Sequence, residues 1–287
     1  DVAKVIEEVL SGGGGGEEDV GKESVMMELT RLVQKVMKES SWWERRGVDC
    51  SILTAICGSF SAQAGMHGHI KMHHAHTNVI GLGDSSVWKV PFLPRVVYLF
   101  LAPLSVPVIT PLVALAHLKG HPSGVVARTV LMIALGLYSQ YWLLINVSGF
   151  RSMHGALFCM LVCRAMFSIP YIHVNIFQHI GLPMFSPTRR PKRIYQMTHG
   201  VLNLPRNPLL DWTFGHSLIS CHVEHHLFPF LSDNMCLKVK PVVSKYLTEK
   251  TLPYQEDTYL SRLHLFFSKY QELMVLAPPI TELVGLQ

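Results

Sequence analysis

Charged residues are scarce in this 287-residue chain, and their scarcity bears on where the chain resides. Asp, Glu, Lys and Arg make up 16% of the sequence, against about a quarter in soluble domains. Hydrophobic residues make up 49%, and the mean hydropathy is +0.27. The formal net charge of +5 is too small to indicate a nucleic-acid partner. The composition favours a membrane protein of one domain, or of two small ones.

The chain has six cysteines, and no two of them form a C-x-x-C pair. The spacing suits neither a zinc ribbon nor a disulfide framework. We therefore expect reduced thiols that pack as small hydrophobic side chains. The N-terminus lacks the charged, apolar and small-residue pattern of a cleavable signal peptide, so none is predicted. The six cysteines are Cys50, Cys57, Cys159, Cys163, Cys221 and Cys236.

The N-terminal part divides into two segments. Residues 1–22 surround "SGGGGGEED" and are predicted to be a disordered Gly-rich tail. Residues 23–46 are predicted to form an amphipathic helix, because apolar side chains recur there at helical spacing between charges. The helix ends in two Trp and two Arg residues, which are types that sit at a bilayer surface. Packing against the rest of the protein remains an equal alternative to that interfacial position.

Three long apolar stretches follow, at about 92–118, 124–148 and 156–177. Each is long enough for a membrane-spanning helix, which needs roughly 20 residues. Five prolines fall in or beside the first stretch, so it is expected to be kinked or only partly inserted. The basic segment 187–193 indicates that the following part faces the cytosol.

Histidine is the residue in excess, with 16 copies, and it is clustered. One cluster follows the pattern H-x-x-x-H-H at His69, His73 and His74, and the other follows H-x-x-H-H at residues 222–226. Residues i and i+4 share a helix face. We therefore expect His69 with His73, and His222 with His226, to face one point, while His74 and His225 reach a second. Neutral imidazole binds Fe, Zn, Cu or Ni, and two such clusters suit two metal ions.

A third element lies between the clusters, where Asn175 and His179 stand four residues apart. The segments "HHAHTNVIGLGD" and "HVEHHLFP" closely resemble the second and third histidine boxes of membrane fatty acid desaturases. The Asn175–His179 pair is similar to the element that those enzymes place between the boxes. The resemblance covers about residues 56–235. It implies eight metal ligands for two iron ions: His69, His73, His74, Asn175, His179, His222, His225 and His226.

The resemblance also implies a fold and an activity. The expected fold is an all-α integral membrane protein with a cytosolic histidine-box domain, in which residues 47–287 form the desaturase domain. The implied reaction uses O₂, two electrons and the di-iron centre to introduce a double bond into an acyl-chain lipid, in the endoplasmic reticulum membrane. No "HPGG" segment of a fused haem domain is present, so a separate cytochrome b5-type protein would supply the electrons. Glu224 is expected to orient a neighbouring imidazole.

The chain departs from the family pattern at its N-terminal side. The family has a first histidine box upstream of the second, but residues 1–66 contain no histidine. We therefore expect a truncated or alternatively spliced form whose incomplete di-iron centre desaturates poorly or not at all, unless His67 replaces a missing ligand. Both boxes must also reach one site, so one of the three apolar stretches should be re-entrant or interfacial. A hydroxylase on the same scaffold, a catalytically dead regulatory isoform and a metal transporter are alternatives.

Overall fold

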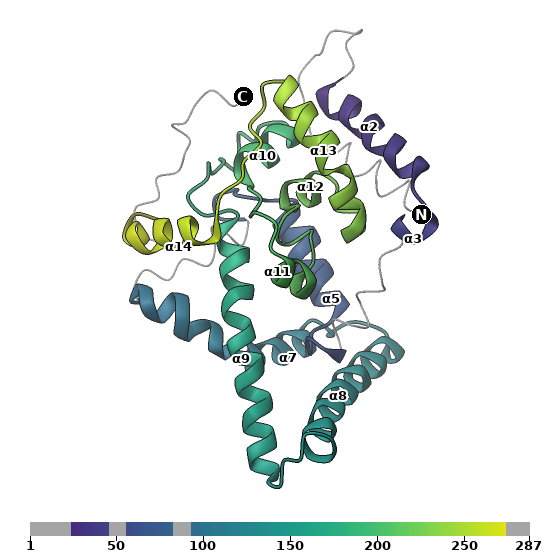
Figure 1. The fold of residues 1–287 in the computed structure, drawn as a ribbon, viewed down its shortest axis with the longest axis vertical. Helices are drawn as coiled ribbons and strands as arrows, with labels where there is room; N and C mark the ends of the chain where they lie inside the picture. Colours follow the sequence, from purple (N-terminus) through teal and green to yellow (C-terminus); the bar gives the residue numbers. More distant parts are fainter. Residues whose placement is uncertain (1–23, 46–55, 83–92, 274–287) are drawn as a thin grey trace.

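The computed structural model describes residues 24–45, 56–82 and 93–273, and the predicted tail at 1–22 lies outside them. The described residues are helical and contain no β-strand beyond two isolated bridges. The fold is thus all-α, as predicted (Figure 1). The helices are α2 (Val25–Glu39), α3 (Trp42–Arg45), α5 (Ala62–Gly65), η1 (Met66–His74), η2 (Val97–Leu101), η3 (Ala102–Ser105), α7 (Val106–Ala116), α8 (Ser123–Asn146), α9 (Met153–Phe177), α10 (Arg193–Gly200), α11 (Pro208–Phe214), α12 (His222–Leu227), α13 (Asp233–Glu249) and α14 (Tyr259–Ser268).

Three helical stretches have the length and composition to cross a membrane: Val97–Ala116, Ser123–Asn146 and Met153–Phe177. At most 17% of the most apolar window in each is buried within the protein. Phe158 on α9 is 69% exposed and Leu131 on α8 is 63% exposed. Each such side chain left in water forgoes about 1.5–3 kcal/mol of burial free energy. Lipid is the medium that these surfaces fit, and the chain is a membrane protein.

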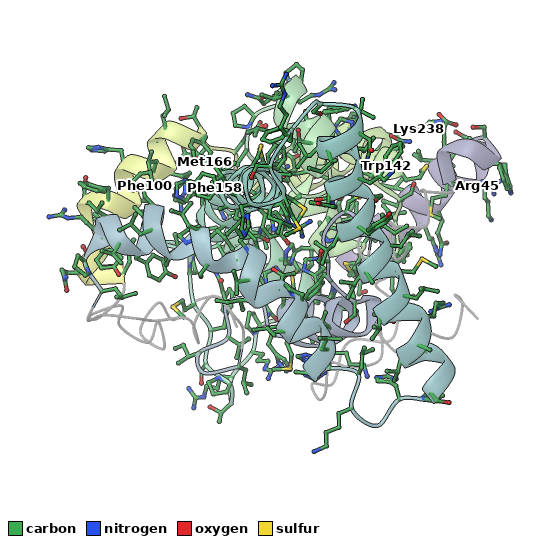
Figure 2. All side chains as sticks on the ribbon, turned by 90° about the horizontal axis from the view of Figure 1, so that it is seen from below. Arg45, Phe100, Trp142, Phe158, Met166 and Lys238 are labelled. Carbon is green, nitrogen blue, oxygen red and sulfur yellow. The ribbon has the colours of Figure 1, made fainter. Side chains whose placement is uncertain are left out.

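The three stretches do not run parallel to one another. In Figure 1 α9 follows the long axis of the molecule, whereas Val97–Ala116 runs crosswise to it. Figure 2 views the molecule from below, so that α9, with Phe158 and Met166 labelled, is seen end on. The Val97–Ala116 stretch is also broken into three helical types, η2, η3 and α7. Prolines at 103 and 107 remove backbone donors near the junctions, so the predicted irregularity is confirmed there.

Helix α2 packs against the protein itself. Its apolar side chains Leu29 and Val33 are fully buried in the core that α13 contributes to. The Tyr246 hydroxyl on α13 donates to the Val25 carbonyl at 2.9 Å, and Lys250 lies 2.8 Å from Glu28. The packing alternative for this amphipathic segment is therefore the one that the structure adopts.

We expect the protein to resist extraction from membranes by alkaline carbonate, because the exposed apolar faces of α8 and α9 would otherwise meet water. Fractionated cells would be treated with carbonate and probed for the chain beside a known spanning protein and a known peripheral protein. Release together with the peripheral protein would contradict the membrane assignment.

Candidate metal centre

The second-box histidines lie on η1, which is a π-helix. Hydrogen bonds in such a helix join residues five apart, so residues i and i+5 become neighbours. His69 and His74 are five apart, and their Nε2 atoms lie 3.1 Å from each other. His73 points to a different set of partners. This local geometry decides which imidazoles meet.

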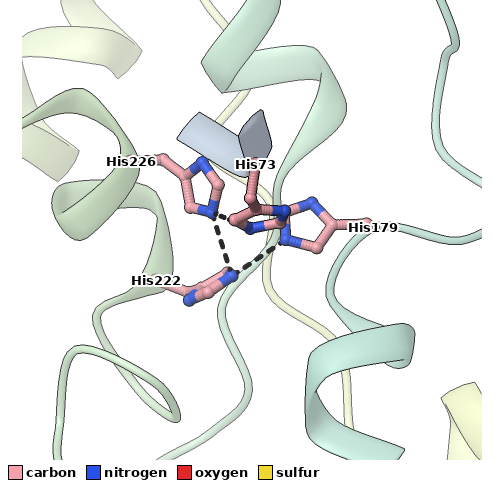
Figure 3. A group of neighbouring side chains, drawn as sticks. All are labelled: His73, His179, His222 and His226. Carbon is pink, nitrogen blue, oxygen red and sulfur yellow. Dashed lines mark hydrogen bonds between the residues drawn. The ribbon is translucent and has the colours of Figure 1, made fainter. Parts of the chain in front are cut away.

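Four buried imidazoles form the first group, which we call the four-histidine group: His73, His179, His222 and His226. Their Nε2 atoms converge, as Figure 3 shows. The Nε2 separations are 3.0 Å for His73 and His226, 3.2 Å for His226 and His222, and 3.0 Å for His222 and His179. Three chain segments that are distant in sequence therefore meet at one point.

Three imidazoles form the second group, the three-histidine group: His69, His74 and His225. Their Nε2 atoms make a nearly equilateral triangle with sides of 3.0, 3.0 and 3.1 Å. His74 is buried, whereas His69 and His225 are half-buried. The ring centroids of His74 and His226 are 4.3 Å apart, so the two groups are adjacent.

The predicted pairing was correct for the third box and wrong for His69. His222 and His226 face one point from the regular helix α12, and His225 joins His74 at the second. His69 was expected beside His73, but it joins His74 and His225 instead. The π-helix makes the i, i+5 pair neighbours. The rings of His69 and His73 remain stacked with their centroids 5.2 Å apart, but the His69 Nε2 atom points to His74 and His225.

The protonation of the four-histidine group fits a bound cation. A neutral imidazole carries one N–H. The Nδ1 atoms of His179 and His222 donate to the carbonyls of Gly200 and Ser217, both at 3.1 Å. The Thr77 hydroxyl donates to the His73 carbonyl and therefore accepts from His226 Nδ1, at 3.1 Å. Three Nε2 lone pairs then face one another at 3.0–3.2 Å, and a cation between them removes the repulsion.

A count of hydrogen-bond donors indicates that the three-histidine group also fits a bound cation. A hydrogen bond needs one ring nitrogen with a proton and one without. In a triangle of nitrogens at most two of the three contacts can satisfy that condition, yet all three are 3.0–3.1 Å long. Such separations suit neighbouring ligands about an ion with metal–nitrogen bonds of about 2.1 Å. Both groups thus fit metal ions.

Burial keeps His74, His222, His225 and His226 neutral, which is the form that binds metal. Loss of hydration and the neighbouring imidazoles hold the pKa values of His222 and His226 well below the usual range. The same causes lower the pKa of His225 to about 3 and lower that of His74 further. At neutral pH each of these rings therefore carries one proton rather than two, and one ring nitrogen is available to bind an ion.

Contacts that the sequence did not reveal hold the boxes together. The Arg193 guanidinium donates to the His226 carbonyl at 2.8 Å and to the His74 carbonyl at 3.4 Å. It thus joins the second box to the third. The Asn78 amide donates to the carbonyls of His179, Pro183 and Gly200. The only sequence signal for these roles was the position of Asn78 directly after the second box.

Three further residues that were expected at the metal centre make other contacts. The Asn175 amide donates to the Tyr171 carbonyl in its own helix at 2.7 Å, so its role as a ligand stays a prediction. His67 is exposed beside His117, with ring centroids 5.5 Å apart. The expectation for Glu224 is wrong, because its buried carboxylate accepts from Tyr254 and Asn203 and fixes α12 to those segments.

Changing Thr77 to Val should weaken metal binding about 10–100-fold, the usual cost of losing a hydrogen bond to a ligating imidazole. Valine keeps the shape but cannot accept the His226 Nδ1 proton. Thr30→Val is the matched control, since Thr30 is also buried and bonds only to the Met26 carbonyl of its own helix. Competition titration with a chelator would measure the affinity, and equal affinities for the two variants would contradict the role of Thr77.

Comparison with known proteins agrees with this geometry. The family model "Fatty acid desaturase" matches residues 34–258. "Fatty acid desaturase 6" of Bos taurus is 51% identical over 96% of this chain and 99% of its own length. The Mus musculus and Homo sapiens proteins of that name are 51% and 50% identical, over 94% and 93% of this chain and 97% and 92% of their own lengths. No solved structure matches significantly.

The relatives have aligned positions for which this chain has no residue. The alignment with the Bos taurus protein runs over 338 positions, whereas 96% of these 287 residues is only about 275, so about 60 positions have no counterpart here. The matched residues nevertheless include every histidine of both groups. The chain therefore belongs to the fatty acid desaturase family.

Proposed function

We propose that this protein is a membrane oxidoreductase of the desaturase type, which holds iron in its two histidine groups and acts on an acyl-chain lipid. The observation that carries the proposal is the convergence of seven imidazole nitrogens on two adjacent points. An all-imidazole donor set is suited to iron with positions left open. Thiolates and carboxylates, which mark other kinds of metal site, are absent from the two groups.

The chemistry explains why such a centre is needed. A methylene C–H bond is not acidic enough for a side-chain base, so a cofactor must supply the oxidising power. Bound iron would supply it with O₂, two electrons and two protons, so that the two hydrogens removed from adjacent carbons and both oxygen atoms would leave as two water molecules. The di-iron count and O₂ come to this chain from the family resemblance.

The chain's own residues would do the positioning. Thr77 and the carbonyls of Gly200 and Ser217 hold the Nδ1 protons, so that the Nε2 atoms face inward. Full burial of His222 and His226 excludes water from the four-histidine group. Exclusion of water protects a reactive oxidant from side reactions.

The membrane arrangement supports a cytosolic position for this site. The crosswise Val97–Ala116 stretch (Figure 1) is the one that we assign to the membrane surface, which leaves α8 and α9 to cross. Both histidine boxes then lie on the same side as the basic segment 187–193, which favours the cytosol. We infer an endoplasmic reticulum location and a separate cytochrome b5-type electron donor from the family.

A second candidate is a catalytically dead isoform with a binding or regulatory role. The absence of about 60 positions of the relatives favours it, and so does the smaller size of the three-histidine group. Hydroxylation starts from the same hydrogen abstraction and is the third outcome to be distinguished.

Product analysis in cells without endogenous desaturases separates these functions. Fatty acids fed to cells expressing the chain would be profiled by mass spectrometry, with His222→Ala as the inactive control. A desaturase gives products lighter by two hydrogens, a hydroxylase gives products heavier by one oxygen, and the dead isoform gives neither. Products of equal amount from the His222→Ala control would contradict a role for the histidine groups.

A further inference from the structure

The two histidine groups differ in the number and burial of their ligands. The four-histidine group has four side chains, each at most 5% exposed. The three-histidine group has three, of which His69 and His225 are half-buried. Each added ligand and each excluded water strengthens the hold on an ion. The groups should therefore differ in affinity.

The two groups differ more sharply in the hydrogen-bond acceptors available to the Nδ1 atoms of their imidazoles. Ligating imidazoles normally donate their second ring proton to an acceptor, which fixes the tautomer and the ring orientation. In the four-histidine group Gly200, Ser217 and Thr77 provide such acceptors. In the three-histidine group the Nδ1 atoms of His74 and His225 are buried and have no partner. A buried donor without a partner costs free energy in itself.

No other imidazole in the described part of the chain makes up this shortfall. His67, the nearest upstream histidine in sequence, is exposed and lies against His117. The relatives have about 60 positions with no counterpart here. Two spanning helices need roughly 40 residues, so a segment of that size could carry both a hairpin and the missing ligands and acceptors.

Building on the proposed function, we propose that this chain on its own is a one-metal protein. The four-histidine group holds one ion tightly, and the three-histidine group binds a second ion at least about 100-fold more weakly, which is the upper part of the range for lost outer partners alone.

The test is a metal titration with Co²⁺ as the probe, on the full chain purified in detergent. Equilibrium dialysis should give one tightly bound ion per chain, and the second should bind at a concentration at least 100-fold higher. The electron paramagnetic resonance signal at one equivalent should be that of an isolated high-spin ion, without coupling to a neighbour. His225→Ala should leave the tight ion in place, and His226→Ala should remove it.

Each other result has a definite meaning. Two ions of equal affinity with a coupled signal would overturn the inference and leave the proposed function standing. No tight ion in the unmodified chain would overturn both. Loss of the tight ion in His225→Ala but not in His226→Ala would assign it to the other group. Because His226→Ala removes a fully buried ring, Thr77→Val serves as a second and milder variant, and the elution volume of each variant reports its folding.

Discussion

Insertion of the residues that the relatives have and this chain lacks should raise product formation by at least about 100-fold. The inserted residues are those of the Bos taurus relative that have no counterpart here, about 60 in number. The physical reason lies in the three-histidine group. Among the residues that the structure describes, the group contains three imidazoles, and two of their Nδ1 atoms lack acceptors. Loss of outer partners alone typically costs 10–100-fold in metal affinity or activity, and missing direct ligands add to it.

The comparison needs controls that share the added length. The same insert with every histidine changed to alanine tests whether the gain comes from ligands. A Gly/Ser-rich insert of equal length tests whether it comes from spacing alone. Acyl chains would be profiled in cells without endogenous desaturase, and bound iron per chain would be measured in parallel. Equal product from the unmodified chain and from the chain with the insert would show that the seven histidines suffice.

Replacing Arg193 by Met should weaken metal binding by about 10–100-fold. Its guanidinium donates to backbone carbonyls of one residue in each histidine group, His74 and His226. Methionine keeps much of the length but donates no hydrogen bond. The two carbonyls lose their shared partner, and the second and third boxes can then shift relative to each other.

Two variants make this test specific. Arg193→Lys keeps the charge but not the fork of two donors, so its affinity should fall between those of the Met variant and the unmodified chain. Arg189→Met removes an exposed arginine of the neighbouring basic segment and should leave the affinity unchanged. If Arg193→Met bound metal as tightly as Arg189→Met, the bridge would have no part in holding the site.

The sequence predicted the membrane helices well because their signal is local. Hydropathy placed apolar stretches at 124–148 and 156–177, and the helices run over Ser123–Asn146 and Met153–Phe177. Length and composition decide such elements without reference to the rest of the fold. The third box was equally accessible, since His222 and His226 sit on a regular helix where the i, i+4 rule holds.

The arrangement of the second box could not be predicted in the same way. "GHIKMHH" is compatible with hydrogen bonds to the fourth or to the fifth residue, and the sequence carries no sign of which is formed. The contacts of Arg193 with His226 and His74, and of Thr77 with His226, join residues 33, 119 and 149 positions apart, which meet only in the folded protein. Their partners are backbone carbonyls and ring nitrogens, and the pattern of side chains in a sequence does not show which of these a given residue will contact.

The π-helix Met66–His74 also has a consequence for the dynamics of the protein. Helices of this type are rare and occur mostly as short segments at functional sites, so the segment's own backbone preference would return it to the commoner helix. What keeps His69 beside His74 must then come from outside the segment, and a shared ion is the strongest candidate for two neutral rings at 3.1 Å. When that ion leaves, the hydrogen bonds of the helix can change from the π-helical i, i+5 pattern to the α-helical i, i+4 pattern, and this change would rotate His69 away from His74. Amide exchange in residues 66–74 would record whether an ion is bound there.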